Sequence, residues 1–350
     1  MTLVGLVRDE CSSDYCKFLV AIIRDPSYSI AELFRSCVKG WGTDEKLLSE
    51  IICTSTNMQL QAAQKAYAAM YDRVMWRDVA NDTTGSYRQL LLALLAGSRG
   101  NIDNWSAEQA AAQLITSEQL VLPSPSESTF IAVYALFSQE QLAEIAGVFE
   151  EASAGVALTD YIKQQGFSDD FVELTINLQS PSVDLMCSQI VDRFEQPEDA
   201  MGSLFKGLSD AMRADWRIIR TIGALPHHTV QEIAVRYEEL TGSALATVCE
   251  EHLSGDYRDA VLAWLSADPS VGMDDPAVAA MVDQGDKESQ PLSTEATEMF
   301  LKYDTDGTDS LSYSEIIALI GSEGFHVPAS LDWFDADADG ALHLHCFMFA

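Results

Sequence analysis

A short glycine-containing stretch, Val38-Lys39-Gly40-Trp41-Gly42-Thr43-Asp44-Glu45, carries residue types suited to holding a cation through backbone oxygens. Glycines at i and i+2 permit a tight turn with carbonyl groups converging on one side. Thr43 is suited to the N-cap of the next helix, and Asp44 and Glu45 suit its positive end. A bare junction between two helices explains this much. Asp82 follows 42 positions after Gly40, just before another expected helix.

A second candidate lies far down the chain, where residues 304–315 space their oxygen atoms as a calcium-binding EF-hand loop does. Loop positions 1, 3, 5, 9 and 12 are Asp304, Asp306, Thr308, Ser312 and Glu315, and Ser310 offers its carbonyl at position 7. Glu315 can bind in the bidentate mode. Asp309 replaces the usual glycine at position 6 and tolerates the left-handed conformation moderately well. Helices are expected on both sides, over 294–303 and 314–320.

A similar loop begins at residue 335. Its calcium ligands would be Asp335, Asp337, Asp339 and the carbonyl of Ala341, but Cys346 stands where the bidentate glutamate belongs. Two interpretations stay open: a weak ion site, or a loop that only pairs with the first. His343 and His345 beside Cys346 raise a zinc site, although a short extended segment is the simpler interpretation.

The glycine stretch and Asp82 together resemble the annexin repeat. Annexins are calcium-dependent phospholipid-binding proteins with repeats of five helices. The resemblance implies that Val38, Gly40 and Gly42 contribute carbonyl ligands to calcium and that Asp82, where family members usually have Glu, contributes the carboxylate. The ion would leave coordination positions open for a lipid phosphate. Trp41 would sit at headgroup level, or else fold back on the helices.

The resemblance extends beyond this repeat, which spans 27–97. Residues 98–180 are expected to form a degenerate repeat, with Lys163 at the carboxylate position, and residues 181–267 one with a degraded loop and His252 there. Residues 1–26 resemble the closing helices of a repeat, with Glu10 in the register of Asp82. An acidic linker over 268–292 and the EF-hand-like pair over 293–350 complete the division.

The elements expected to position these groups are helices. Apolar residues recur at helical spacing at Leu47, Leu48, Ile51 and Ile52, and again at Leu90, Leu91, Leu94 and Leu95. No convincing strand alternation occurs before residue 267, so the fold class is predicted to be all-α. Cys37 and Cys53 fall within such patterns, where free cysteine behaves as a small hydrophobe. The His227-His228 pair after Pro226 is expected to be exposed.

Charge limits the classes of partner. The chain has 350 residues and a formal net charge of −33, with 54 Asp and Glu against 21 Lys and Arg. Such a surplus argues against nucleic-acid binding, which needs Lys and Arg to neutralise phosphates. It also repels anionic membranes unless a cation bridges the two. Residues 268–350 alone hold 17 acidic residues and two lysines, a net charge of 2 − 17 = −15.

The motifs and the charge are compatible with two functions. The first is calcium-dependent binding to anionic phospholipid at the cytoplasmic face of membranes, with calcium sensing by the tail. The second is a calcium-regulated scaffold for a cytoskeletal or other protein partner. No catalytic motif such as GxSxG, HExxH or a P-loop occurs, so the chain is not expected to be an enzyme. The absence of a signal peptide pattern and of paired cysteine motifs favours the cytoplasm.

Overall fold

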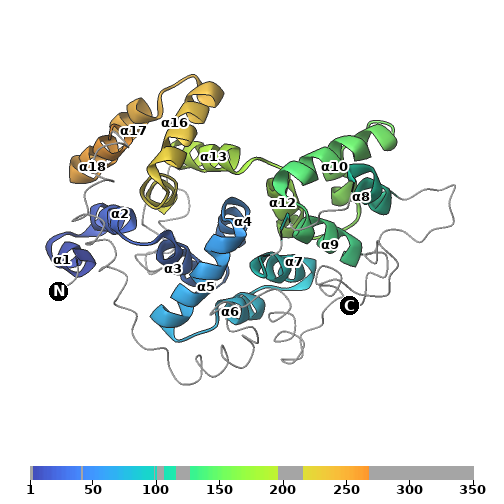
Figure 1. Cartoon of the computed structure of the whole chain (residues 1–350), viewed down its shortest axis with the longest axis horizontal. Helices are drawn as coiled ribbons and strands as arrows, with labels where there is room; N and C mark the ends of the chain where they lie inside the picture. The colour runs from blue at the N-terminus through green and yellow to red at the C-terminus, as the bar shows by residue number, and fades with distance from the viewer. Residues whose placement is uncertain are drawn as a thin grey trace. The chain divides into compact units, whose positions relative to one another are not determined.

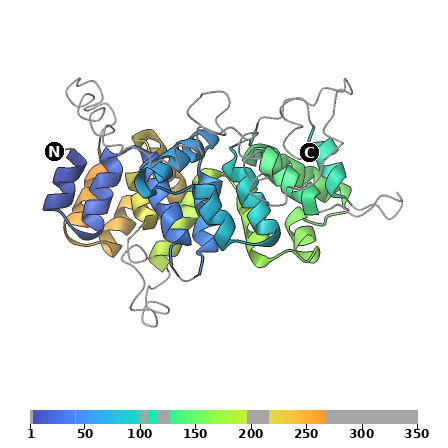
Figure 2. The same cartoon turned by 90° about the horizontal axis from the view of Figure 1, so that it is seen from below.

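The protein is all-helical over the part of the chain that its computed structural model describes (Figures 1 and 2). The described residues are 3–40, 42–97, 99–100, 106–115, 127–195 and 216–267. Their regular elements are α-helices and one π-helix, with no strand among them, which confirms the predicted fold class. Contacts group these residues into two compact units. Unit 1 holds described residues up to Gly40 and from Ser182 onward, and unit 2 holds those from 42 to Pro181.

Unit 2 is built from nine described helices that follow one another along the chain. They are α4 (Glu45–Thr54), α5 (Asn57–Tyr71), α6 (Met75–Asp82), α7 (Gly85–Leu95), α8 (Ala107–Leu114), α9 (Glu127–Leu136), α10 (Gln139–Ala152), α11 (Leu158–Gln164) and α12 (Asp169–Leu178). Helix α4 packs against α12 and α7, and α7 packs against α9. These four helices form the centre of the unit, and both apolar faces predicted from the sequence are buried there.

The starts of the helices follow local capping chemistry. Asp44 is the N-cap of α4, because its carboxylate accepts a hydrogen bond from the Leu47 amide at 3.0 Å. The expectation that Thr43 caps this helix is therefore wrong. Thr56 caps α5 and Ser138 caps α10, each in a reciprocal capping box with a glutamine three residues later. A side chain that satisfies these amides typically stabilises a helix by about 1 kcal/mol.

Unit 1 combines the first three helices with the last described ones. Its elements are α1 (Leu3–Glu10), α2 (Ser13–Ile23), α3 (Pro26–Val38), α13 (Ser182–Glu195), α15 (Trp216–Ile218), the π-helix η2 (Ile219–Gly223), α16 (His227–Thr241), α17 (Leu245–His252) and α18 (Gly255–Leu265). Helix α2 packs against α1, η2 and α18. In Figure 2 the orange α18 lies beside the blue N-terminal helices. Phe18 of α2 is fully buried in this core and makes an edge-to-face ring contact with Tyr257.

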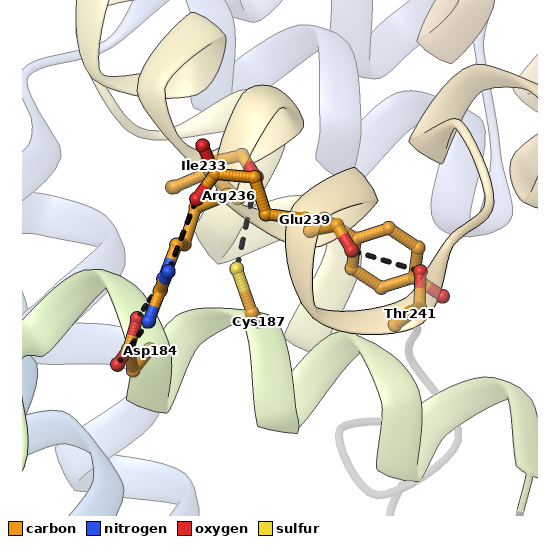
Figure 3. Close-up of polar contacts among 7 residues, drawn as sticks. Asp184, Cys187, Ile233, Arg236, Glu239 and Thr241 are labelled. Atoms are coloured by element: carbon orange, nitrogen blue, oxygen red, sulfur yellow. Dashed lines mark hydrogen bonds and ion pairs between the residues drawn. The ribbon is translucent and has the colours of Figure 1, made fainter.

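An ion pair links α13 to α16 in unit 1 (Figure 3). The guanidinium of Arg236 donates to both carboxylate oxygens of Asp184, at 2.6 and 3.1 Å. This hydrogen bonding lowers the pKa of Asp184 below its usual value. One turn along α13, the thiol of Cys187 points to the Ile233 carbonyl at 3.6 Å, and burial raises its pKa to about 11. Cys187 is therefore a neutral core residue. Cys37 and Cys53 are also buried, and neither forms a disulfide.

Candidate calcium site

The predicted glycine loop has the backbone conformation that requires glycine. Val38 is the last residue of α3 and is buried. Gly40 has φ of +131° and Gly42 has φ of +86°, both in the region that L-residues rarely adopt. No atom lies within 4 Å of a Cβ built on either residue, so the backbone and not crowding selects glycine. Trp41 lies outside the described residues, and its membrane contact stays a prediction.

Asp82 is the last residue of α6 and is exposed to solvent. The Thr43 hydroxyl donates to the backbone carbonyl of Asp82 at 2.9 Å. Two further bonds fix the helices on either side: the Tyr87 hydroxyl contacts the Glu45 carbonyl at 2.8 Å and the Ser49 hydroxyl at 3.0 Å. The residue expected to cap α4 therefore ties the loop to the end of α6, which holds Asp82 in a fixed place beside Gly42.

The four proposed ligands are divided between the two compact units. Val38 and Gly40 belong to unit 1, whereas Gly42 and Asp82 belong to unit 2. Their convergence on one ion stays a prediction from the resemblance.

Asp82 also lines a polar cleft of about 470 Å³ within unit 2. Four helices, α4, α7, α9 and α12, begin at its wall, and their first turns provide most of the lining. The carboxylates on the wall are Glu45, Asp82, Glu127 and Asp170, and the Ser86 hydroxyl donates to Glu127. No motif in the sequence groups Glu127 and Asp170 with Asp82. Glu127 and Asp170 lie in the first turns of α9 and α12, and neither helix start was predicted from the sequence.

The residues around Asp82 fit a hard cation. Calcium binds carboxylate, hydroxyl and carbonyl oxygens, and the described wall of the cleft offers these with no Lys or Arg among its lining residues. Within the described residues no group of three or more His, Cys, Asp or Glu side chains is close enough to form a complete metal site. A site that binds through backbone carbonyls and one carboxylate agrees with both observations.

At the corresponding positions of the other expected repeats, two side chains are not carboxylates and one is a glutamate. Lys163 forms an exposed ion pair with Asp160 at 3.1 Å. His252 ends α17, and its ring lies 5.0 Å from the ring of Phe194. Glu10 ends α1 and is exposed. The positive charge of Lys163 disfavours calcium, and the loss of calcium binding in these repeats stays a prediction.

His227 differs from its expectation. It begins α16 but is buried, with Nε2 3.0 Å from the Trp264 carbonyl and its ring edge-on to the Trp264 ring. The prediction that this residue is exposed is wrong, because α18 packs near the start of α16 and covers it.

Both EF-hand-like loops and their flanking segments lie outside the described residues. The ligands assigned to them therefore stay predictions from the sequence. Most of the first loop of the degenerate repeat, over 116–126, also lies outside the described residues, as do residues 196–215.

Comparison with known proteins completes the description. Residues 29–94 match the annexin family model. Annexin A8 of Oryctolagus cuniculus is 26% identical over 271 residues, covering 76% of this chain and 79% of the relative. Human annexin A13 is 26% identical over 267 residues, covering 75% and 80%. These comparisons strongly support the annexin family. The solved structure of annexin III is similar with a TM-score of 0.63, at 21% identity and over 76% of this chain and 79% of that one. Calcium-bound annexin (Sm)1 is similar with a TM-score of 0.59, at 20% identity and over 76% and 77%.

The structural likenesses show the annexin fold for this chain. Annexins are in general calcium-dependent, phospholipid-binding proteins that associate peripherally with membranes, and they are not enzymes. This agrees with the expectation that the chain has no catalytic function. None of the helices in the described residues is long and apolar enough to cross a membrane.

Proposed function

We propose that this chain binds anionic phospholipid membranes in a calcium-dependent and reversible manner, at the cytoplasmic face. One observation carries the proposal: within unit 2, Thr43, which follows the positive-φ Gly42, donates its hydroxyl to the backbone carbonyl of the exposed residue Asp82. Carbonyl groups of Val38, Gly40 and Gly42 and the carboxylate of Asp82 would hold the ion. The family-model match over 29–94 supports the same segment.

The physical role of calcium follows from charge. A protein with a net charge of −33 is repelled by an anionic lipid surface, and the repulsion acts over about 8 Å at physiological ionic strength. Calcium takes six to eight oxygen ligands. Protein groups that supply four leave positions that lipid phosphate can fill, so the ion bridges two negative partners. Trp41 would add contact at headgroup level.

Sedimentation with phosphatidylserine vesicles tests the proposal. The wild-type chain should pellet with vesicles in calcium and return to solution with EGTA. Asp82→Asn should raise the calcium concentration needed for half-maximal pelleting by about tenfold, the loss expected for one charged ligand. Asp72→Asn is the matched control, because it removes the same charge from the end of α5 at a left-handed position that Asn tolerates. Pelleting that persists in EGTA, or equal shifts in both variants, would contradict the mechanism.

The EF-hand-like pair over 293–350, called the tail here, is proposed to add calcium sensing. The 304–315 loop has a complete set of oxygen ligands, whereas the 335–346 loop lacks the bidentate one. Calorimetric titration of the full chain with calcium should lose one binding step in Glu315→Gln, with vesicle pelleting through Asp82 retained. If the titration of this variant is unchanged, the first loop is not a calcium site.

A second function is favoured by Lys163 and His252, which replace carboxylates in two of the expected repeats. An array with a single calcium-binding repeat would serve mainly as a scaffold for a cytoskeletal or other protein partner, regulated through the tail. Actin co-sedimentation in calcium without vesicles separates the two functions. Filament binding together with absent vesicle pelleting would favour the scaffold.

A further inference from the structure

Unit 1 repeats part of the helix arrangement at the centre of unit 2. In unit 2, α7 packs against α9 and α12, and α4 packs against α7 and α12. In unit 1, α2 packs against η2 and α18 in the same way that α7 packs against α9 and α12. Among the described residues of unit 1, no helix takes the place of α4. Because the two centres are similar, the burial of corresponding residues can be compared one by one.

Helices α2 and α7 have the same length and can be compared from their N-caps, Ser12 and Thr84. One face is buried in both helices: Phe18, Val20 and Ala21 in α2 correspond to Leu90, Leu92 and Ala93 in α7. A second face differs. The α7 residues on it are buried, namely Tyr87, Leu91, Leu94 and Leu95. The corresponding α2 residues are only half-buried, namely Tyr15, Leu19, Ile22 and Ile23.

Helices α12 and α18 differ in the same sense. Counted from their N-caps, Ser168 and Ser254, Leu174 of α12 corresponds to Ala260 of α18. Leu174 is fully buried, and its carbonyl accepts a contact from the Cys53 thiol of α4 at 4.0 Å. Ala260 is half-buried, and Val261 is the one buried residue within the described α18. Five residues of α12 are buried: Phe171, Val172, Leu174, Thr175 and Leu178.

These residues define one surface, the α2–α18 face: Tyr15, Leu19, Ile22, Ile23 and Ala260. Unit 2 shows what covers the equivalent surface. It is a ten-residue helix, α4, whose Leu48, Ile51 and Ile52 are fully buried and whose Ser49 hydroxyl lies 3.0 Å from the Tyr87 hydroxyl. The matching occupant of the α2–α18 face must offer a short helix with adjacent branched apolar residues and a small hydroxyl.

The chain itself contains such a segment. Ser49-Glu50-Ile51-Ile52 of α4 recurs in the tail as Ser314-Glu315-Ile316-Ile317, within the expected helix 314–320. We propose that residues 314–320 dock on the α2–α18 face in the place that α4 takes in unit 2. Ile316 and Ile317 would cover Leu19 and Ile22. Ser314 would meet Tyr15, which stands in the register of Tyr87.

The connection between the two is long enough. Residues 268–313 separate the end of the described chain from the segment, a span of 313 − 267 = 46 residues rich in Asp, Gly, Pro and Ser. Counting only the 25 residues of the expected linker, 268–292, a fully extended chain spans up to about 80 Å. Attachment to the same chain raises the local concentration of the segment to the millimolar range, as a rough guide. Even a weak helix–face contact is therefore sufficiently populated to be measured.

Hydrogen exchange on the full chain in EGTA tests the docking without involving the calcium sites. In Ile316→Asp/Ile317→Asp, amides of α2 and α18 should exchange about tenfold faster than in the wild type, because a docked population of nine-tenths is lost. Exchange in α7 and α12 should not change. The matched control, Val278→Asp/Met281→Asp, adds the same two charges in the expected linker and should leave α2 and α18 as in the wild type. Unchanged exchange in the first variant would overturn the proposal.

A photo-crosslink identifies the occupant directly. Benzoylphenylalanine in place of Leu19, in an equal mixture of ¹⁴N and ¹⁵N chains, should link to the peptide containing 314–320, with both halves carrying the same isotope. Mixed-isotope products would instead assign the face to a second copy of the chain. Products with any other segment would also overturn the proposal. Failure of vesicle binding through Asp82 would leave both measurements unaffected, since neither contains calcium or lipid.

Discussion

Gly40 and Gly147 both have open space where a Cβ would stand, but their backbones differ. Gly40 has φ of +131°, whereas Gly147 lies within α10 with no such conformation. Gly40→Ala should destabilise the protein by about 1–2 kcal/mol, since an L-residue is strained there. Gly147→Ala should stabilise it by about 0.5–1 kcal/mol, because alanine loses less entropy in a helix. Urea unfolding of both variants measures the difference. Equal effects would show that the loop does not hold Gly40 in that conformation.

Asp184 sets the pH dependence of the α13–α16 contact. Its native pKa is lowered by the hydrogen bonds from Arg236, so the stabilisation is present above the ordinary aspartate pKa and is lost as pH falls through the lower native value. Both side chains are partly exposed, so Asp184→Asn should cost only about 0.5–1 kcal/mol at pH 7. The cost should shrink below about pH 3.9. Urea unfolding at pH 7 and pH 3 tests this, with Glu144→Gln on α10 as the control. A cost that is constant with pH would exclude the ion pair as its source.

Much of the residue-level picture could be predicted from the sequence, and the misses have a physical pattern. The apolar faces at Leu47 and Leu90 and the glycine loop follow from local spacing and were recognised. Thr43 and Asp44 are equally good N-cap residues in the sequence. In the structure the Thr43 hydroxyl donates to the Asp82 carbonyl, and Asp44 caps α4 instead. Glu127 and Asp170 join Asp82 through the packing of α7, α9 and α12. Contacts between segments that are distant in the sequence cannot be predicted from the local spacing of residues.

At the scale of elements, η2 and α2 approach each other closely at Gly223. A Cβ on Gly223 would stand 2.9 Å from Cδ2 of Phe18, which is fully buried. Gly223→Ala should therefore force η2 away from α2 and destabilise unit 1 by about 1–3 kcal/mol. Hydrogen exchange should show the effect in α2 and not in α7. Phe18→Leu combined with Gly223→Ala should recover part of the loss, since the smaller side chain gives the methyl group room. Two costs that simply add would contradict the steric explanation.

At the scale of the whole molecule, the two units should differ in stability. The centre of unit 2 consists of four packed helices, and α12 has five buried residues. In the described part of unit 1, α18 has one buried residue, and its other apolar residues in the core are partly buried. Regions with fewer buried contacts open at lower free energy. Native-state hydrogen exchange in low urea should therefore open α18 before α12. Simultaneous opening of both helices would mean that the chain unfolds as one cooperative body.

The route of the chain through unit 1 has a consequence for protein synthesis. The described residues of unit 2 all lie between 42 and Pro181, so their helices can pack together once that stretch has left the ribosome. Helix α2 must wait for its partner α18, and 254 − 23 = 231 residues separate the end of one from the start of the other. At about 5–20 residues per second this wait lasts roughly 10–50 s. During that time Phe18 and the apolar residues near it stay exposed on the nascent chain, where a chaperone can bind them.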